Sequence, residues 1–94
     1  MSLKKRNVTL DGGQIATAED VYDAFATQLG LPEYFGRNLD ALWDLLAVDV
    51  KGPLEIVWKD AELSRKKLGG QFDLFVALLC DVEAERQDIR IRIC

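Results

Sequence analysis

Alternating hydrophobic and polar residues predict strands near the two ends of the chain. Asn7–Leu10 is a short run that ends in the turn residues Asp11-Gly12-Gly13, and Ile89–Ile93 alternates isoleucine with arginine. A period of two residues is typical of a strand with one face in water. Leu54–Trp58, which follows the helix-breaking pair Gly52-Pro53, is almost continuously apolar and predicts a third strand.

Hydrophobic residues at helical spacing predict the elements between these strands. A first helix begins after Thr17, which forms a short capping box with Asp20, and it ends at Gly30. A second helix begins after Asn38, which is its N-cap. The apolar face of the second helix consists of Leu39, Leu42, Leu45 and Leu46.

Two further helices are predicted in the second half of the chain. Residues 61–68 form a short helix that Gly69-Gly70 ends, and a longer helix of about four turns follows it. The apolar positions of the longer helix are Phe72, Phe75, Val76, Leu79 and Val82. Because Cys80 lies within this apolar run, we expect it to be buried, and we expect the terminal Cys94 to be a loose thiol.

The order of strands and helices predicts the fold class. Strands that are separated by helices pair in parallel through right-handed crossovers. We therefore expect one α/β domain over residues 1–94, in which a three-stranded parallel sheet packs against three to four helices. Residues 1–6 are expected to be a disordered or extraneous tail.

Composition and charge narrow the class of protein. No apolar run approaches the roughly 20 residues that span a bilayer. The basic N-terminus lacks the apolar stretch of a signal peptide, and two cysteines are too few for a disulfide framework, so the cytoplasm is the expected location. Removing the three charges of Lys4, Lys5 and Arg6 from the net charge of −4 leaves −7 on the rest of the chain. A domain with this negative charge should repel nucleic acid and attract a basic protein partner.

The residue types argue against catalysis and against a metal or cofactor. The chain has no histidine, which removes the commonest general base and the commonest zinc ligand. Asp40 and Asp44 have the chemistry of an acid/base pair, but a domain of this size leaves little room for a deep pocket. We therefore expect neither an enzyme nor a metal protein.

Two helices carry acidic pairs that helix stability does not explain. Asp44 lies one turn after Asp40 on the same face, and like charges at this spacing repel each other. Asp81 and Glu85 form a second such pair near the end of the last helix, where the helix dipole disfavours anions, and Arg86 is the only nearby cation. A solvated face would explain any one of these acids, but the two pairs together indicate an anionic surface for a partner.

Aromatic residues flank the first acidic pair. Phe35 and Trp58 are expected in the core, and Trp43 is expected either in the core or at its rim. Tyr34 follows Pro32 in a segment that cannot continue a helix. A loop tyrosine beside carboxylates is a good candidate for an exposed anchor at an interface.

The segment Leu31–Asp44, LPEYFGRNLDALWD, resembles the signature of the barstar family. The resemblance continues more weakly through Gly52-Pro53-Leu54 and Trp58 to the last helix and strand. It implies an intracellular inhibitor of a secreted, guanyl-specific ribonuclease of the barnase type. In that family an acidic helix and the preceding loop enter the enzyme's active site, where carboxylates occupy the positions of RNA phosphates. The resemblance implies no cofactor, and a monomer that forms a 1:1 complex.

The resemblance also implies a set of partner-binding residues. Asp44 would be the central carboxylate and Asp40 its neighbour on the same helix, with Tyr34 packing on the enzyme. The remaining positions of the set are Asn38, Trp43, Asp81 and Glu85, of which the last two would face the enzyme's basic rim.

Three positions depart from the family pattern. Ala47, Val48 and Asp49 replace a threonine, a glycine and a tryptophan of the best-known member, so the identity of the ribonuclease stays open. Two other interpretations also stay open. One is a non-inhibitory module whose acidic face docks another basic protein, and the other is a carboxylate-dependent enzyme or an acidic metal site.

Overall fold

The computed structural model describes residues 6–94, and the chain over this range forms the predicted three-stranded parallel sheet with its helices. Strand β1 begins at Arg6 and runs to Asp11, so Arg6 belongs to the sheet and not to a disordered tail. The rest of the expected tail, residues 1–5, lies outside the described residues.

The strands occur in the sheet in their sequence order, β1-β2-β3. β2 (Leu54–Lys59) is central and pairs in parallel with β1 and with β3 (Ile89–Ile93). Two parallel pairs in this order require two crossover connections, and right-handed crossovers place both sets of helices on the same face. The prediction of an α/β fold with parallel strands is therefore confirmed.

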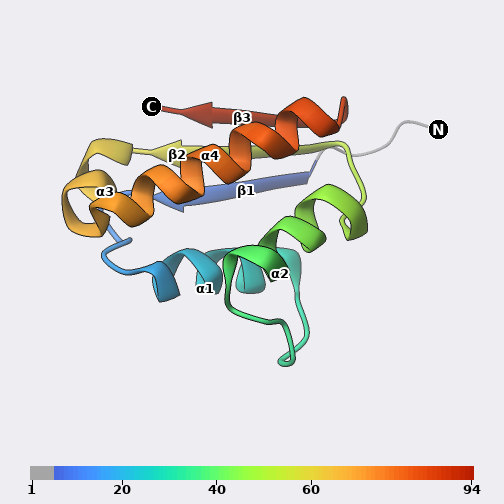
Figure 1. Ribbon diagram of the computed structural model, residues 1–94, viewed down its shortest axis with the longest axis horizontal. Coiled ribbons are helices and arrows are strands. Elements are labelled where there is room, and N and C mark those ends of the chain that lie inside the picture. Colours follow the sequence, from blue (N-terminus) through green and yellow to red (C-terminus); the bar gives the residue numbers. More distant parts are fainter. Residues whose placement is uncertain (1–5) are drawn as a thin grey trace.

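The helices cover one face of the sheet, as Figure 1 shows. Helix α4 (Gly70–Glu85) crosses the three strands diagonally, and α1 (Ala18–Leu29) and α2 (Leu39–Asp44) lie below it in this view. The short helix α3 (Ala61–Leu68) lies at the end of the sheet where β2 finishes. The buried strand side chains face this helical layer; they include Val8, Leu10, Leu54, Ile56, Trp58 and Ile89.

Local capping explains where the first two helices begin and end. Thr17 and Asp20 form the predicted capping box at the start of α1, and Gly30 ends that helix with a left-handed backbone (φ 64°). The Asn38 side chain accepts a hydrogen bond from the Ala41 amide at 2.8 Å and so caps α2. These predictions from sequence are confirmed.

The second helix differs from the prediction of one continuous α-helix. After Asp44 the chain continues as a π-helical turn, η1 (Leu45–Asp49), in which the Val50 amide donates to the Leu45 carbonyl at 2.7 Å. A bond from residue i+5 to residue i widens the turn. Leu42 and Leu46 stay fully buried through this change.

Two other details correct the sequence analysis. Gly69 ends α3, but Gly70 is already the first residue of α4 and not part of a break between them. Cys80 is exposed, because it lies just beyond the buried edge of α4 that Phe75, Leu79 and Val82 form.

Trp58 is fully buried, as predicted, and Phe35 is only partly buried where it packs against the core.

Side chains from the helical layer cover the backbone at both edges of the sheet. The Gln28 side chain from α1 accepts from the Thr9 amide at 2.8 Å and donates to the Thr9 carbonyl at 2.7 Å. At the opposite edge, the Glu83 carboxylate from α4 accepts from the Ile91 amide at 2.8 Å. Edge strands expose unpaired backbone groups, so both contacts protect the sheet from pairing with another chain.

Candidate functional site

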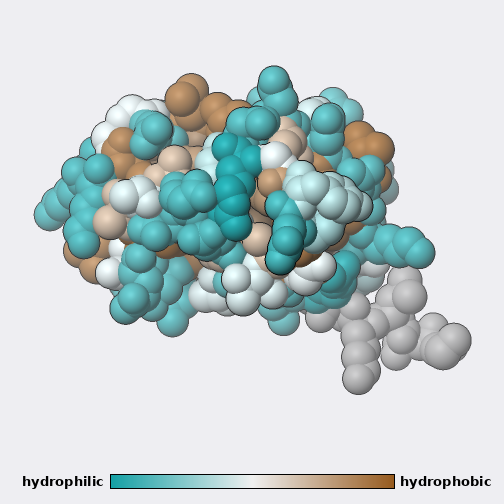
Figure 2. All heavy atoms as spheres, turned by 90° about the horizontal axis from the view of Figure 1, so that it is seen from below, coloured by the Kyte–Doolittle hydropathy of each residue, from teal (hydrophilic) through white to brown (hydrophobic). Residues whose placement is uncertain are grey.

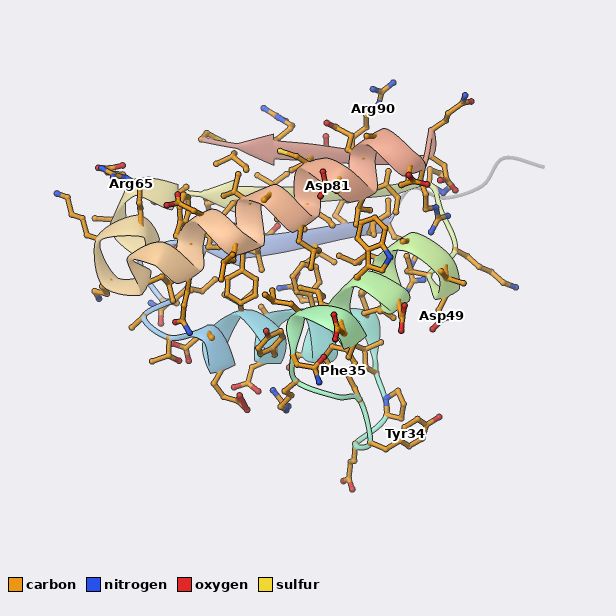
Figure 3. The ribbon with its side chains drawn as sticks, in the orientation of Figure 1. Tyr34, Phe35, Asp49, Arg65, Asp81 and Arg90 are labelled. Carbon is orange, nitrogen blue, oxygen red and sulfur yellow. The ribbon has the colours of Figure 1, made fainter. Side chains whose placement is uncertain are left out.

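Tyr34 lies at the tip of the loop that joins α1 to α2. Gly30 ends α1 and Pro32 prevents its continuation, so the chain leaves the helical layer here. The Tyr34 side chain is 88% exposed, whereas Phe35 packs back against the core. Figure 3 shows Tyr34 projecting away from the body of the molecule. A large exposed aromatic on a loop has the character of a partner contact.

Asp40 and Asp44 are exposed on α2, one helical turn apart. Asp40 lies in the first turn, where the helix dipole favours an anion. Among residues 6–94, neither carboxylate forms an ion pair. Their negative charges are therefore open to a partner.

The Arg37 side chain does not neutralise Asp40, although the two residues are only three positions apart. Its guanidinium instead contacts two carboxylates on α1, with Nη1 3.3 Å from Glu19 Oε1 and 2.5 Å from Asp23 Oδ1. These pairs tie the end of the loop to α1. They also direct the Arg37 guanidinium away from the acids of α2.

A hollow of about 410 Å³ lies between the Tyr34 loop and the helical segment that follows it. Apolar groups form much of its lining, including Leu31, Pro32, Phe35, Ala41 and Leu45. Tyr34, Asp44 and Asp49 line the same hollow. The structure thus brings the predicted Tyr34 and Asp44 together and adds Asp49, whereas Asp40 and Asn38 lie outside the lining.

Arg86 holds the segment that carries Asp49. Its Nη1 donates to the carbonyl oxygens of Leu46 and Val50 at 3.0 and 2.5 Å, and the rest of the guanidinium pairs with Asp88. The side chain is 17% exposed. Hydrogen bonds from Arg86 lower the pKa of Asp88 below its usual value. Arg86 was the expected counter-ion of the acids on α4, but its donors are used at η1 and Asp88 instead.

Asp81 and Glu85 are exposed on α4. Neither forms an ion pair within the described part of the chain. Glu83, the third acid near this helix end, binds the Ile91 amide and so belongs to the sheet edge. In Figure 3, Asp81 and Tyr34 lie on opposite sides of α2. The acids of α4 therefore form a second patch beside the α2 site.

The remaining predicted residues have structural roles at the margin of this surface. Asn38 is exposed, and its side-chain oxygen is used in capping α2. Trp43 is partly buried and packs against the core, which places it at the rim. Figure 2 shows the molecule from the side to which the Tyr34 loop projects; hydrophilic residues cover most of this face. Charged groups beside the exposed Tyr34 and Val48 suit recognition through both charge and apolar contact.

The described part of the chain has neither a metal-binding cluster nor a membrane-spanning helix. No group of three or more histidine, cysteine or acidic residues among them could hold a metal ion. No helix within residues 6–94 is long and apolar enough to cross a membrane.

Asp49 also lines the site, although the sequence analysis did not predict it as a partner-binding residue and named it only as a departure from the family pattern. Asp49 is five positions after Asp44, which on an α-helix would put the two about 140° apart around the axis. The π turn reduces this angle, and both residues line the same hollow. No local sequence signal revealed the turn in advance.

Comparison with known proteins identifies the family. The family model described as "Barstar (barnase inhibitor)" matches residues 5–94. The chain is also 36% identical over 83 residues to a Bacillus subtilis (strain 168) protein named "Putative ribonuclease inhibitor YrdF", and the match covers 88% of this chain and 91% of that protein. The chain therefore belongs to the barstar family, a family of ribonuclease inhibitors and not of enzymes.

Proposed function

We propose that this chain inhibits a secreted, guanyl-specific ribonuclease of the barnase type by occupying its active site with α2 and the loop before it. The carboxylates of Asp40 and Asp44 take the positions of RNA phosphates against the enzyme's basic groups. Tyr34 packs on the enzyme surface beside them. Family membership supports the class of partner, and the exposed acids of α2 support the mode of binding.

One observation carries this proposal: the acids of α2 are exposed, and no cation within residues 6–94 forms an ion pair with them. Arg37 is the nearest basic residue in sequence, and it pairs with Glu19 and Asp23 on α1. Folding alone would favour a cation between two carboxylates one turn apart, because like charges at this spacing repel each other. A ribonuclease that binds RNA phosphates presents the missing positive charge.

The other predicted residues have supporting roles in this complex. Asn38 fixes the start of α2 through its cap, and Trp43 packs at the margin of the contact. Asp81 and Glu85 attract the basic rim of the enzyme from α4. The inhibitor acts as a monomer in a 1:1 complex in the cytoplasm, where it protects the cell that makes the ribonuclease.

The test is titration of guanyl-specific ribonucleases with the purified chain, beside the variants Asp44→Asn and Asp73→Asn. Both variants remove one negative charge, but Asp73 lies in the first turn of α4, where its charge acts on Arg65 of α3. Asp44→Asn should weaken inhibition by about tenfold or more, because it leaves the enzyme's basic groups without a partner. Asp73→Asn should inhibit as the parent chain does.

Two results would overturn the proposal. One is that no ribonuclease of this class is inhibited at equimolar concentration. The other is that Asp44→Asn inhibits as well as the parent chain. Recovery of a stoichiometric, non-nuclease basic protein on the immobilised chain would then favour a non-inhibitory binding module.

A further inference from the structure

The π turn places Asp49 beside Asp44. On an α-helix a residue five positions further lies about 140° around the axis, on a different face. A turn closed by a bond from residue i+5 to residue i contains more residues than an α-helical turn, so a residue five positions further lies nearer to the first one's side of the axis. η1 follows Asp44 directly and ends at Asp49, and both carboxylates line the hollow beside Tyr34.

The position of Asp49 is fixed by tertiary contacts. Arg86 binds the carbonyl oxygens of Leu46 and Val50 on either side of it, at 3.0 and 2.5 Å. Val50 is buried, which anchors the end of the turn in the core. The backbone that carries Asp49 is therefore held in place by contacts within the fold, so a partner does not have to order this turn.

The chemistry of this lining suits one kind of basic side chain better than another. Much of it is apolar, Tyr34 offers an aromatic ring, and the two acids give it a double negative charge. A guanidinium group is planar and weakly hydrated, stacks on aromatic rings and binds carboxylates through several donors. A lysine ammonium is compact and strongly hydrated, so it loses more on entering an apolar hollow.

We propose that this hollow receives an arginine side chain of the basic partner, and that Asp49 is the residue that makes it specific for arginine. This inference rests on the proposed function for its choice of partner. In the complex the guanidinium lies between the carboxylates of Asp44 and Asp49, and its aliphatic stem lies along the apolar lining and Tyr34.

The test uses a small probe and needs no ribonuclease. N-acetyl-arginine amide is titrated into the ¹⁵N-labelled full chain at low salt, with N-acetyl-lysine amide as the comparison ligand. The arginine probe should shift the amide signals of residues 31–36 and 44–50 along saturating curves, and it should bind more tightly than the lysine probe. Asp49→Asn should weaken arginine binding about three- to fivefold, as expected for one exposed ion pair. Asp73→Asn, the matched charge change on α4, should leave it unchanged.

Shifts spread over all acidic surfaces, equal binding of the two probes, or unchanged binding by Asp49→Asn would overturn the inference. Its failure is distinguishable from failure of the proposed function. Ribonuclease inhibition without selective arginine binding would reject the arginine site alone. Selective arginine binding without inhibition of any guanyl-specific ribonuclease would reject the inhibitor proposal alone.

Discussion

The guanidinium of Arg86 and the carboxylate of Asp88 form a bidentate ion pair, with Nε–Oδ1 and Nη2–Oδ2 distances of 3.0 and 2.8 Å. This pair orients the guanidinium so that Nη1 reaches the carbonyl oxygens of Leu46 and Val50. Backbone carbonyls at the end of a helix otherwise lack partners. The end of α4 therefore holds the end of η1, and with it Asp49.

Replacing Arg86 should destabilise the fold. Arg86→Ala removes charged hydrogen bonds to two backbone carbonyls, which stay partly buried and lose this partner. The free energy of unfolding should therefore fall by about 2–3 kcal/mol. Urea denaturation measures this change. Arg65→Ala is the control, because the ion pair of Arg65 with Glu62 lies on the exposed surface of α3, and its effect should be much smaller. Equal effects of the two variants would contradict the role given to Arg86.

The Arg86–Asp88 pair also predicts a dependence of stability on pH. Hydrogen bonds from Arg86 lower the pKa of Asp88 from its ordinary value of 3.8. A carboxyl whose pKa is lower in the folded state stabilises the fold above its unfolded pKa, and this contribution is lost as pH falls. The parent chain should therefore be more stable than Asp88→Asn at pH 7, and the difference should shrink at about pH 3. A difference that does not change with pH would contradict this assignment.

The parts of the fold that sequence predicted correctly depend on local interactions. The capping box of Thr17 and the Asn38 cap each involve residues within one turn, so the signal lies in a few neighbouring positions. The alternation in Ile89–Ile93 likewise reports which side of one strand is buried. Such features can be inferred without knowledge of the rest of the chain.

The parts that sequence missed depend on contacts between distant segments. The π turn at Leu45–Asp49 is held by Arg86, about 40 positions later in the chain, and no helical period signals it. Arg37 and Arg86 look like counter-ions of nearby acids in sequence, but tertiary structure directs both elsewhere. The acids of the candidate site could therefore be predicted from the sequence. The direction of Arg37 and Arg86 toward other groups and the position of Asp49 in the hollow could not.

Close packing around Gly12 predicts a strong effect of adding a single methyl group. A Cβ atom built at Gly12 would lie 1.9 Å from the carbonyl oxygen of Asp60, which is backbone and cannot move aside easily. Gly12→Ala should therefore lower the free energy of unfolding by about 3 kcal/mol or more, or prevent folding. Thermal unfolding, followed by circular dichroism, gives the comparison.

Gly70→Ala is the matched control for this effect. Apart from its chain neighbours and the backbone of its own helix, no atom of residues 6–94 lies within 4 Å of a Cβ built at Gly70, and the residue is the first of α4. Alanine restricts the unfolded chain more than glycine does, so this variant should be about 0.4–1 kcal/mol more stable than the parent. Similar stability of the two variants would show that packing at Gly12 is looser than the distances indicate.

The Gln28 contact with the edge of β1 predicts a second local effect. Gln28→Ala removes both hydrogen bonds to Thr9, so the free energy of unfolding should fall by about 1–2 kcal/mol. The exposed edge should also increase self-association, measured by light scattering at high concentration. Gln87→Ala, in the turn before β3, is the control and should change neither property. Loss of stability without more self-association would limit the role of Gln28 to its hydrogen bonds.

The two acidic patches should affect different steps of ribonuclease binding. Charges at the rim of an interface attract the partner over a distance and mainly set the association rate, whereas a charge that becomes buried and paired mainly sets the dissociation rate. Asp81→Asn and Glu85→Gln should therefore slow association at low salt, and this effect should disappear at high salt because ions screen it. Asp44→Asn should instead speed dissociation at both salt concentrations. Stopped-flow kinetics with an inhibited ribonuclease measure the association and dissociation rates separately. If Asp81→Asn dissociates faster and associates at an unchanged rate, Asp81 lies inside the interface with the ribonuclease and not at its rim.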